Sequence, residues 1–445
     1  MLDLQKKIGI RVPEILMPKE GIDLEKWAVV ACDQFSSQPE YWEEVEKMCE
    51  NQESTLHIIF PEVYLGKVKD EDKISKINRT MKKYLDEKIL VNQGPGFIYI
   101  DRETPYVKSR KGLIISLDLE CYNYEKGSKS LARSTEETDI HRLPPRVKIR
   151  EKASIELPHI LLLIDDPKKT VIEPLEEETS SYKPLYDFDL MMNGGHIKGF
   201  KIDEEKVILR IMKALENLIN PKEQKDRYKI EEEPFLFAVG DGNHSLASAK
   251  DHWENVKKDL SEEERENHPA RFALVEIINL HDKGLEFEPI HRVIFNTKLD
   301  NFLKEFKDFY PESSYISCET KEEMLEKAKK LREEGTFHII PFMNKEGYGL
   351  LVVKNPKNNL EVGTLQVFLD KYLKENKEIH IDYIHGEDVL EELGTKENNL
   401  ALYLPSMDKN DLFKTVILDG VLPKKTFSMG EAEEKRYYLE CKKIK

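Results

Sequence analysis

The sequence is poor in cysteine and has no pattern that would join its cysteines. Five are scattered along 445 residues, and none belongs to a C-x-x-C pair. An odd, dispersed set is typical of reduced thiols in the cytosol, and it argues against both a disulfide framework and a cysteine zinc site. The five positions are Cys32, Cys49, Cys121, Cys318 and Cys441.

Long apolar runs are also missing. The longest lies near Leu157–Ile164, which is much too short to cross a bilayer. The first residues (MLDLQKK) have neither the basic start nor the apolar core of a signal peptide. Together these absences predict a cytoplasmic protein that has no membrane partner.

Positive charge is scarce overall. The formal net charge is -16, with 35% charged and 39% apolar residues. Proteins that bind nucleic acid generally do so through clustered positive surface, so this balance argues against a nucleic-acid partner. It leaves room for a local basic pocket. A chain of 445 residues is expected to form two domains.

Helices and strands interleave along the chain without a regular βαβ period or an internal repeat. This pattern favours the α+β class, with mixed sheets and helices. From residue 296 onward, the predicted helices Leu299–Phe309, Lys321–Glu334 and Leu365–Asn376 alternate with short strands. We therefore predict a catalytic domain over residues 1–295 and a C-terminal α/β domain over residues 296–445.

The N-terminal part contains several short predicted elements. Phe97–Asp101 and Gly112–Leu119 alternate like paired strands, and Leu56–Phe60 is predicted as another strand. Ser37 and Glu40 have the spacing of a capping box at a helix start.

A glycine-rich turn is the strongest candidate for chemistry. It lies between the apolar strand Pro234–Val239 and the predicted helix Leu246–Lys257. Glycines allow main-chain N–H groups to approach an anion, and the helix dipole adds to the attraction. The turn residues are Gly240, Asp241, Gly242, Asn243, His244 and Ser245. The alternative is a tight structural turn in which Asp241 or Ser245 only caps the helix. No Walker A motif occurs in the sequence.

A basic segment is the second candidate. Arg133, Arg142 and Arg146 surround a rigid Pro-Pro turn, and a guanidinium group matches phosphate with a planar fork of donors. Thr135 could add a hydroxyl contact, and Glu136 a general base. The alternative is a surface loop whose arginines pair with the many acidic residues.

Two further histidine motifs are candidates for a substrate pocket. Asn193 and His196 flank a Gly-Gly turn, and His291 and Arg292 precede an apolar stretch. The alternatives are an ordinary turn and a hydrogen-bonded structural histidine. Asp33 follows the first predicted strand, where a polar side chain would face a cleft.

Three stretches carry a family resemblance. The segments GDGNHSLASAK (Gly240–Lys250), EPIHRV (Glu288–Val293) and Arg133–Arg150 resemble the bacterial and archaeal family called domain of unknown function 1015. The likeness covers nearly the whole chain.

Many members of that family carry Asp-Gly-His-His-Arg where this chain has Asp241–Ser245. That form resembles the phosphate-handling turn of ParB-like and sulfiredoxin-like nucleotide-binding folds, a group that includes free serine kinases. The resemblance implies a core of this type with insertions, and it retains Asp241 and His244. Asn243 and Ser245 replace a histidine and an arginine, which removes one cation.

The leading hypothesis is a phosphotransferase that moves a phosphoryl group between ATP or ADP and a hydroxyl amino acid, with serine and O-phosphoserine as the expected pair. In it, Asp241 holds Mg²⁺, Glu136 is the base and the arginines screen phosphate charge. The expected partners are thus a nucleotide and a small-molecule substrate. A metal-assisted phosphatase acting on phosphoserine and a nucleotide-switched regulatory protein are the alternatives.

Overall fold

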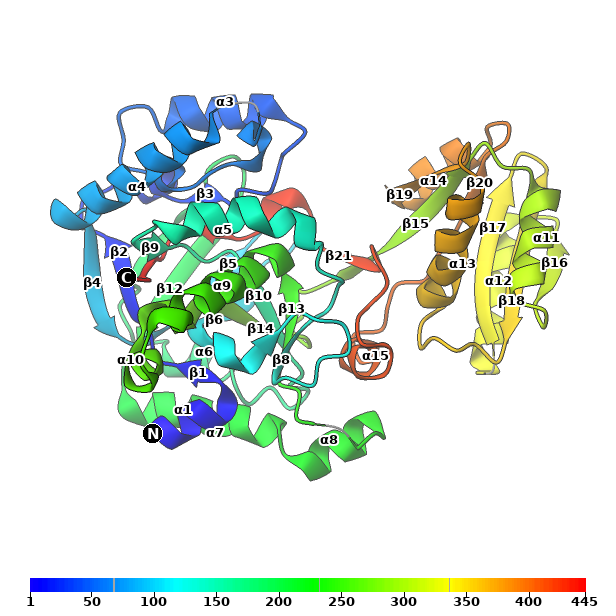
Figure 1. Cartoon of the computed structure of the whole chain (residues 1–445). Coiled ribbons are helices and arrows are strands. Elements are labelled where there is room, and N and C mark those ends of the chain that lie inside the picture. Colours follow the sequence, from blue (N-terminus) through cyan, green and yellow to red (C-terminus); the bar gives the residue numbers. More distant parts are fainter. Residues whose placement is uncertain (67–68, 232, 336) are drawn as a thin grey trace. The chain divides into compact units, whose positions relative to one another are not determined.

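The computed structural model describes residues 1–66, 69–231, 233–335 and 337–445. The chain divides into two compact units (Figure 1). Unit 1 comprises Met1–Glu286 together with Gly430–Lys445, and unit 2 comprises Phe287–Met429. The sequence prediction placed one boundary near residue 296. In the structure the chain enters unit 2 at Phe287, and its last residues return to unit 1.

A mixed sheet forms the centre of unit 1. Strand β13 pairs parallel with β8 and antiparallel with β10, whereas β10 pairs parallel with β14. This confirms the predicted α+β class with mixed sheets. In order across the sheet the strands are β11 (Tyr186–Asp189), β12 (His196–Ile202), β5 (Phe97–Glu103), β6 (Arg110–Asp118), β14 (Phe272–Asn279), β10 (Leu161–Ile164), β13 (Phe237–Asp241), β8 (Ala132–Ser134) and β7 (Tyr122–Asn123), with β1 (Ile10–Arg11) beside β6.

Apolar side chains cover both faces of this sheet. Along β5, Phe97 and Tyr99 belong to one buried cluster and Ile98 and Ile100 to another, as the alternation of a strand requires. Residues of α1, α7 and α9 join the first cluster, and residues of α3 and α4 join the second. The helices of unit 1 are α1 (Leu2–Ile8), α2 (Leu24–Trp27), α3 (Pro39–Met48), α4 (Asp70–Asp86), α5 (Leu143–Glu151), α6 (Leu175–Glu178), α7 (Glu205–Leu218), α8 (Pro221–Tyr228), α9 (Asn243–Val256) and α10 (Glu262–Asn267).

The returning C-terminal segment is part of the core of unit 1. Arg436, only 3% exposed, forms ion pairs with Glu276 and Glu440, and Tyr186 donates its hydroxyl to Glu440 at 2.5 Å. The buried charge of Arg436 is thus paired within unit 1, and breaking this pairing would leave an uncompensated buried charge. Short strand pairs complete the unit: β22 (Tyr437–Tyr438) with β3 (Val29–Val30), β23 (Lys442–Lys443) with β9 (Ile155–Glu156), and β2 (Glu14–Pro18) with β4 (Leu90–Pro95).

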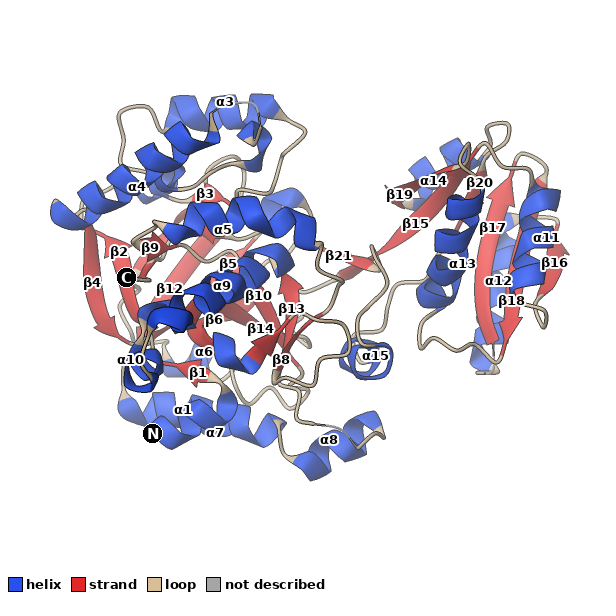
Figure 2. Cartoon of the chain, viewed as in Figure 1, coloured by secondary structure: helices blue, strands red, loops and turns tan. Residues whose placement is uncertain are grey.

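Unit 2 is built around a second sheet, whose strands are flanked by helices in Figure 2. Along β17, Ile339 and Met343 face one buried cluster, and Ile340 and Phe342 face the other. Its strands are β15 (Phe287–Phe295), β16 (Ser314–Cys318), β17 (Phe337–Asn344), β18 (Gly347–Lys354), β19 (His380–His385), β20 (Leu400–Leu402) and β21 (Phe427–Met429). Its helices are α11 (Leu299–Phe309), α12 (Lys321–Glu333), α13 (Glu361–Glu375), α14 (Glu387–Gly394) and α15 (Asp411–Asp419).

Two local predictions are wrong. The predicted strand Leu56–Phe60 begins as a 3-10 helix, Thr55–Ile58, because Ser54 caps it by accepting the N–H of Leu56 at 3.2 Å. The predicted capping box at α3 does not form. Its N-cap is Gln38 without a side-chain cap, and Pro39 opens the helix.

Helix lengths and cysteine positions can be compared with the sequence predictions. Among the described residues, no helix has the length and apolar character needed to cross a membrane. All five cysteines carry free thiols.

Candidate functional site

The glycine-rich turn joins β13 to α9, as the sequence predicts. Gly240 and Asp241 end the strand, and Gly242 is the N-cap of the helix, with φ of 79°. A Cβ atom at this position would lie 3.1 Å from both Cα and Cγ1 of Ile160. The left-handed backbone and the close approach of Ile160 both require glycine at residue 242.

The N-terminus of α9 offers donors to an anion. The helix has no side-chain cap and no acidic residue in its first turn, and its first intrahelical bond runs from Leu246 N to Gly242 O at 3.0 Å. The N–H groups of Asn243, His244 and Ser245 therefore have no partner within the helix. The buried Asn243 Oδ1 also has no hydrogen-bond partner within the described parts of the chain. The turn thus presents N–H donors and one buried acceptor.

Asp241 is held at the start of this turn. Its Oδ1 accepts the N–H of Gly242 at 2.9 Å, and its Oδ2 lies 3.4 Å from Lys435 Nζ. Lys435 comes from the C-terminal segment, and the sequence reasoning did not select it. It supplies a cation next to the turn.

His244 is a neutral imidazole above acidic pH. Burial, followed by the charges of Arg142 and Arg146, lowers its pKa to about 4. Its Nε2 accepts the N–H of Asp139 at 3.3 Å, so the proton of the neutral ring is on Nδ1. In this state His244 is a hydrogen-bond donor through Nδ1.

The two arginines that act on His244 share one carboxylate. Arg146 pairs with Glu62 Oε1 and donates to Arg142 O at 2.7 Å, and Arg142 lies 3.4 Å from Glu62 Oε2. The side chain of Arg142 is 49% exposed and that of Arg146 is 16% exposed. Both therefore place positive charge near the turn, and Arg142 has the greater freedom to reorient toward a ligand.

Arg133 and Thr135 support the strand that carries the turn. Arg133 donates to Ser130 O at 2.8 Å and to Glu233 O at 3.1 Å, and its guanidinium lies over the Phe235 ring. Thr135 donates to Val239 O at 2.6 Å. Glu136 is half-buried just after β8. Direct ligand contacts by these three residues stay predictions.

The structure adds a group around His159 that sequence reasoning mostly missed. Gly242 would place its Cβ 3.5 Å from Cδ2 of His159, and the Tyr438 hydroxyl lies 2.8 Å from His159 Nδ1. The same hydroxyl accepts the N–H of Cys32 at 3.2 Å. Burial alone would raise the pKa of the neighbouring Asp33 carboxyl, but His159, the Gln34 amide and Lys435 hold that pKa below its usual range. An ionised Asp33 thus belongs to the surroundings of the turn.

Asn193 and His196 lie at the β11–β12 end of the sheet. Asn193 is exposed, with φ of 59°. His196 Nδ1 is 2.6 Å from Asp189 Oδ1, and its Nε2 is 2.7 Å from Asp187 Oδ1. Both ring nitrogens are therefore occupied by carboxylates of the adjacent strand. Their role in a substrate pocket stays a prediction.

His291 and Arg292 belong to unit 2. His291 Nδ1 accepts the N–H of Leu404 at 3.1 Å, and burial lowers its pKa to about 4. Arg292 is fully buried and donates to the carbonyls of Ile290, Lys424 and Lys425. These contacts match the structural alternative for this motif.

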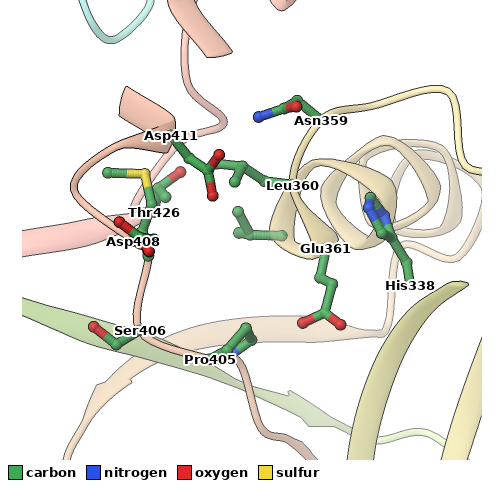
Figure 3. A pocket seen from close by; sticks show the side chains of 11 residues that line it. His338, Asn359, Leu360, Glu361, Pro405, Ser406, Asp408, Asp411 and Thr426 are labelled. Carbon is green, nitrogen blue, oxygen red and sulfur yellow. The ribbon is translucent and has the colours of Figure 1, made fainter. Parts of the chain in front are cut away.

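Unit 2 also contains a pocket of about 230 Å³ (Figure 3). His338, Glu361, Asp408 and Asp411 are among its lining residues, which include none of the sequence candidates. Burial and the charge of Asp408 raise the pKa of Asp411. Because its charged lining residues are carboxylates, this pocket repels phosphate rather than attracting it.

A magnesium site would have to be completed by a ligand. The described residues contain no group of three or more His, Cys, Asp or Glu side chains placed to hold a metal ion. Magnesium is commonly bound through one or two carboxylates together with substrate phosphates. That Asp241 holds such an ion stays a prediction.

Comparisons with known proteins add a family and some distant structures. The family model described as "Protein of unknown function (DUF1015)" matches residues 16–372. No curated protein matches the chain. Among solved structures, a free serine kinase variant in complex with AMP is 10% identical, with a TM-score of 0.40, and the match covers 77% of this chain and 95% of that one.

Two more structures are similarly distant. A free serine kinase variant in complex with ADP is 10% identical, with a TM-score of 0.39, and the match covers 75% of this chain and 92% of the kinase. A conserved hypothetical protein from Pyrococcus furiosus is 11% identical, with a TM-score of 0.35, and the match covers 74% and 94% of the two chains.

Proposed function

The chain belongs to the DUF1015 family, whose description names no activity, and from the geometry of the β13–α9 turn we propose that it is a phosphotransferase. It moves a phosphoryl group between a nucleotide and a hydroxyl amino acid, with serine and O-phosphoserine as the expected pair. The observation that supports this proposal is the uncapped N-terminus of α9, where three N–H groups have no helical partner, Asn243 Oδ1 is orphaned, and Lys435, Arg142 and Arg146 supply nearby positive charge.

The anion-binding part of the proposal uses the turn and its cations. The N–H groups of Asn243, His244 and Ser245 donate to phosphate oxygens, and the dipole of the 14-residue helix adds to the attraction. Neutral His244 donates through Nδ1. Lys435 and Arg142 screen the charge of the phosphates, with Arg146 behind them, and Arg133 and Thr135 act indirectly by holding β13 in place.

The acceptor hydroxyl needs a group that takes its proton. In the forward direction the serine oxygen attacks phosphorus, the bond from phosphorus to the nucleotide oxygen breaks, and the hydroxyl proton passes to a carboxylate. Glu136 is the base that the sequence suggests, and Asp33 is the ionised carboxylate that the structure adds. Replacing each in turn, as Glu136→Gln and Asp33→Asn, separates the two.

The proposed cofactors are Mg²⁺ and ATP or ADP. Asp241 would hold the ion, which would neutralise charge on the phosphate oxygens. Lys435 contacts the same carboxylate, so Asp241 exchanges a protein cation for a ligand-borne one when the nucleotide binds.

Phosphorus NMR of the purified full chain with Mg²⁺ tests the proposal. The samples contain ATP or ADP with serine, and separately phosphoserine with and without ADP. We expect a new phosphoserine signal in the first set and nucleotide-dependent loss of phosphoserine in the second. Release of inorganic phosphate from phosphoserine alone would instead identify a phosphatase. Nucleotide binding without turnover would identify a regulatory protein.

Asp241→Asn gives the decisive variant. It removes the carboxylate charge at the turn, and we expect turnover to fall at least ~100-fold, as for other phosphoryl-transfer groups. Asp203→Asn is the matched control, because Asp203 also pairs with a lysine, Lys201, at 2.8 Å but lies just beyond β12. Full turnover by the Asp241 variant would refute the assignment.

A further inference from the structure

The ring of His159 lies against the anion-binding turn. The ring atom Cδ2, which is bonded to Nε2, would be 3.5 Å from a Cβ at Gly242. The opposite nitrogen, Nδ1, is 2.8 Å from the hydroxyl of Tyr438. The side of the imidazole that carries Cδ2 therefore faces the turn, and Nδ1 faces the C-terminal segment.

The backbone on both sides of His159 is fixed. Pro158 O accepts Nε of the buried Arg436 at 3.1 Å, and Ile160 O accepts the N–H of Glu276 at 3.0 Å. Immediately afterwards the chain enters β10, in the middle of the sheet. The position of the imidazole is thus set before any ligand binds, which is the condition for an effective binding group.

The contacts of Tyr438 decide which ring nitrogen carries the proton. Burial keeps the pKa of Tyr438 well above its usual value, so the phenol is protonated. Its oxygen accepts the N–H of Cys32 at 3.2 Å, and its own proton can be donated to His159 Nδ1, 2.8 Å away. With Nδ1 acting as an acceptor, the proton of the neutral imidazole is on Nε2.

No described residue accepts a hydrogen bond from His159 Nε2, although the ionised Asp33 carboxylate interacts electrostatically with the ring. Asp33 Oδ1 accepts a hydrogen bond from the Gln34 amide at 3.0 Å, and Asp241 interacts with Gly242 N and Lys435. An anion at the N-terminus of α9 would be an acceptor on the same side of the ring. Imidazole N–H groups bind phosphate oxygens as neutral donors, so this contact adds to the main-chain N–H groups without requiring a charged histidine.

We propose that His159 is a phosphate-binding residue of the site, donating its Nε2–H to an oxygen of the bound phosphoryl group, and that Tyr438 is the positioning residue that holds this tautomer. The inference rests on the proposed phosphotransferase function and deepens it. It assigns two residues that neither the turn motif nor the arginine segment contains, one of them in the segment that returns after unit 2.

Side-chain replacements that keep one nitrogen at a time test the assignment. Glutamine places its amide near the position of Nε2, whereas asparagine places its amide near the position of Nδ1. By calorimetric titration of the full chain with ADP, we expect His159→Asn to bind about tenfold more weakly, the usual effect of losing one hydrogen bond to a charged group. His159→Gln should stay within about threefold of the unaltered protein, since it keeps the donor.

Adenosine and inorganic phosphate serve as matched probes. The loss of affinity in His159→Asn should appear with ADP and with inorganic phosphate. It should be absent with adenosine, because only a phosphate contact is removed. His57→Asn is the control variant, since His57 is also in unit 1 but bonds to Gln52 O at 3.0 Å in a 3-10 turn. Equal losses with adenosine would show a structural role and overturn the proposal.

Tyr438→Phe tests the positioning role separately. Nitrogen NMR of labelled protein should show Nε2 protonated and Nδ1 unprotonated in the unaltered ring, and a mixture of tautomers in the variant. ADP affinity should fall about threefold, in proportion to the lost tautomer. If the unaltered protein binds none of the phosphate probes, the proposed function fails. If it binds them and every His159 variant binds equally well, only this inference fails.

Discussion

Two histidines beside arginines give the clearest comparison within this protein. His244 in unit 1 and His291 in unit 2 both have a pKa lowered to about 4. The arginine next to His291 is fully buried and donates to three carbonyls, so its donors are engaged inside the fold. The arginines near His244 instead share Glu62, and Arg142 is half exposed.

The difference shows why a histidine–arginine motif does not define a site. Burial lowers both pKa values, but only the turn at His244 combines cations with helix N–H groups that lack partners. At His291 and Arg292 the same residue types close a network within unit 2. A polar group whose hydrogen bonds are all made inside the fold has little left to offer a ligand.

The largest expected effect is loss of the Arg292 network. Arg292→Leu removes a fully buried guanidinium that donates to three carbonyls, and we expect unit 2 to lose about 4 kcal/mol of unfolding free energy. All three tryptophans, Trp27, Trp42 and Trp253, lie in unit 1. In urea, the circular dichroism transition of the variant should therefore shift while the tryptophan fluorescence transition stays in place.

A surface change controls this experiment. Lys329→Leu removes an exposed cation of α12 in the same unit and should leave both transitions within about 0.5 kcal/mol of their original positions. If Arg292→Leu behaved in the same way, the network would not be structural and the contrast with His244 would collapse.

Gly242→Ala comes next in size. The added Cβ must accept φ of 79° and contact Ile160 at 3.1 Å, so we expect a loss of about 2 kcal/mol in unfolding free energy. Displacement of the turn should weaken ADP binding at least ~10-fold, measured by calorimetry. Gly127→Ala is the matched control, because Gly127 has φ of 76° and its Cβ would meet nothing within 4 Å. Equal binding losses in both variants would exclude a specific role for the turn.

A smaller effect is expected when charge is removed near His244. Arg146→Gln should raise the pKa of His244, because a nearby cation disfavours the protonated ring. Arg142→Gln should raise it too, and an NMR pH titration of the imidazole signals compares the size of the two pKa changes. ADP affinity should fall a few-fold in each variant. An unchanged His244 titration in both variants would show that burial alone lowers this pKa.

The smallest effect concerns stability against pH. The folded pKa of His244 is below the usual value of 6.5, so unfolded chains bind more protons and stability falls as pH drops from 6.5 toward 4. In His244→Gln this loss of unfolding free energy should be smaller by roughly 1 kcal/mol. Urea unfolding followed by tryptophan fluorescence at each pH measures it.

His196 provides a control of opposite sign in the same unit. Burial opposes the shift, but Asp189 and Asp187 raise the pKa of His196. The stabilising effect of protonated His196 is present below pH 6.5 and is lost as the pH rises through the pKa of this group in the folded protein. His196→Gln should therefore cost most at low pH. Matching pH profiles for the two variants would contradict both assignments.

Much of the local structure could be predicted from the sequence. The strand–glycine–helix order around Gly242, the pairing of β5 with β6 and the helices of unit 2 follow from apolar periodicity and turn chemistry. The local predictions that are wrong lie where a tertiary contact overrides the local sequence preference. Thr55, for example, donates to Trp27 O at 2.8 Å and is drawn into a 3-10 turn instead of a strand.

The residues that surround the candidate site were harder to predict from the sequence. His244 stood out because it lies in the same turn as two glycines, whereas His159 precedes an unremarkable apolar strand. Lys435 lies in a C-terminal stretch whose sequence gives no sign that it returns to unit 1. The buried network of Arg436 with Glu276 and Glu440 accounts for that return, and it joins residues distant in sequence.

Sequence alone determined the acidic, cysteine-poor character of this protein, its α+β class and the glycine-rich turn between a strand and a helix, because these depend on composition and on residues close together in the chain. Tertiary structure decided which arginines lie near that turn and which donate their hydrogen bonds to main-chain carbonyls inside the fold. It also placed Asp33, His159 and Lys435 around the turn. The reason is physical: burial and partner geometry set the charge and the free donors of a side chain, and both arise only when distant segments pack together.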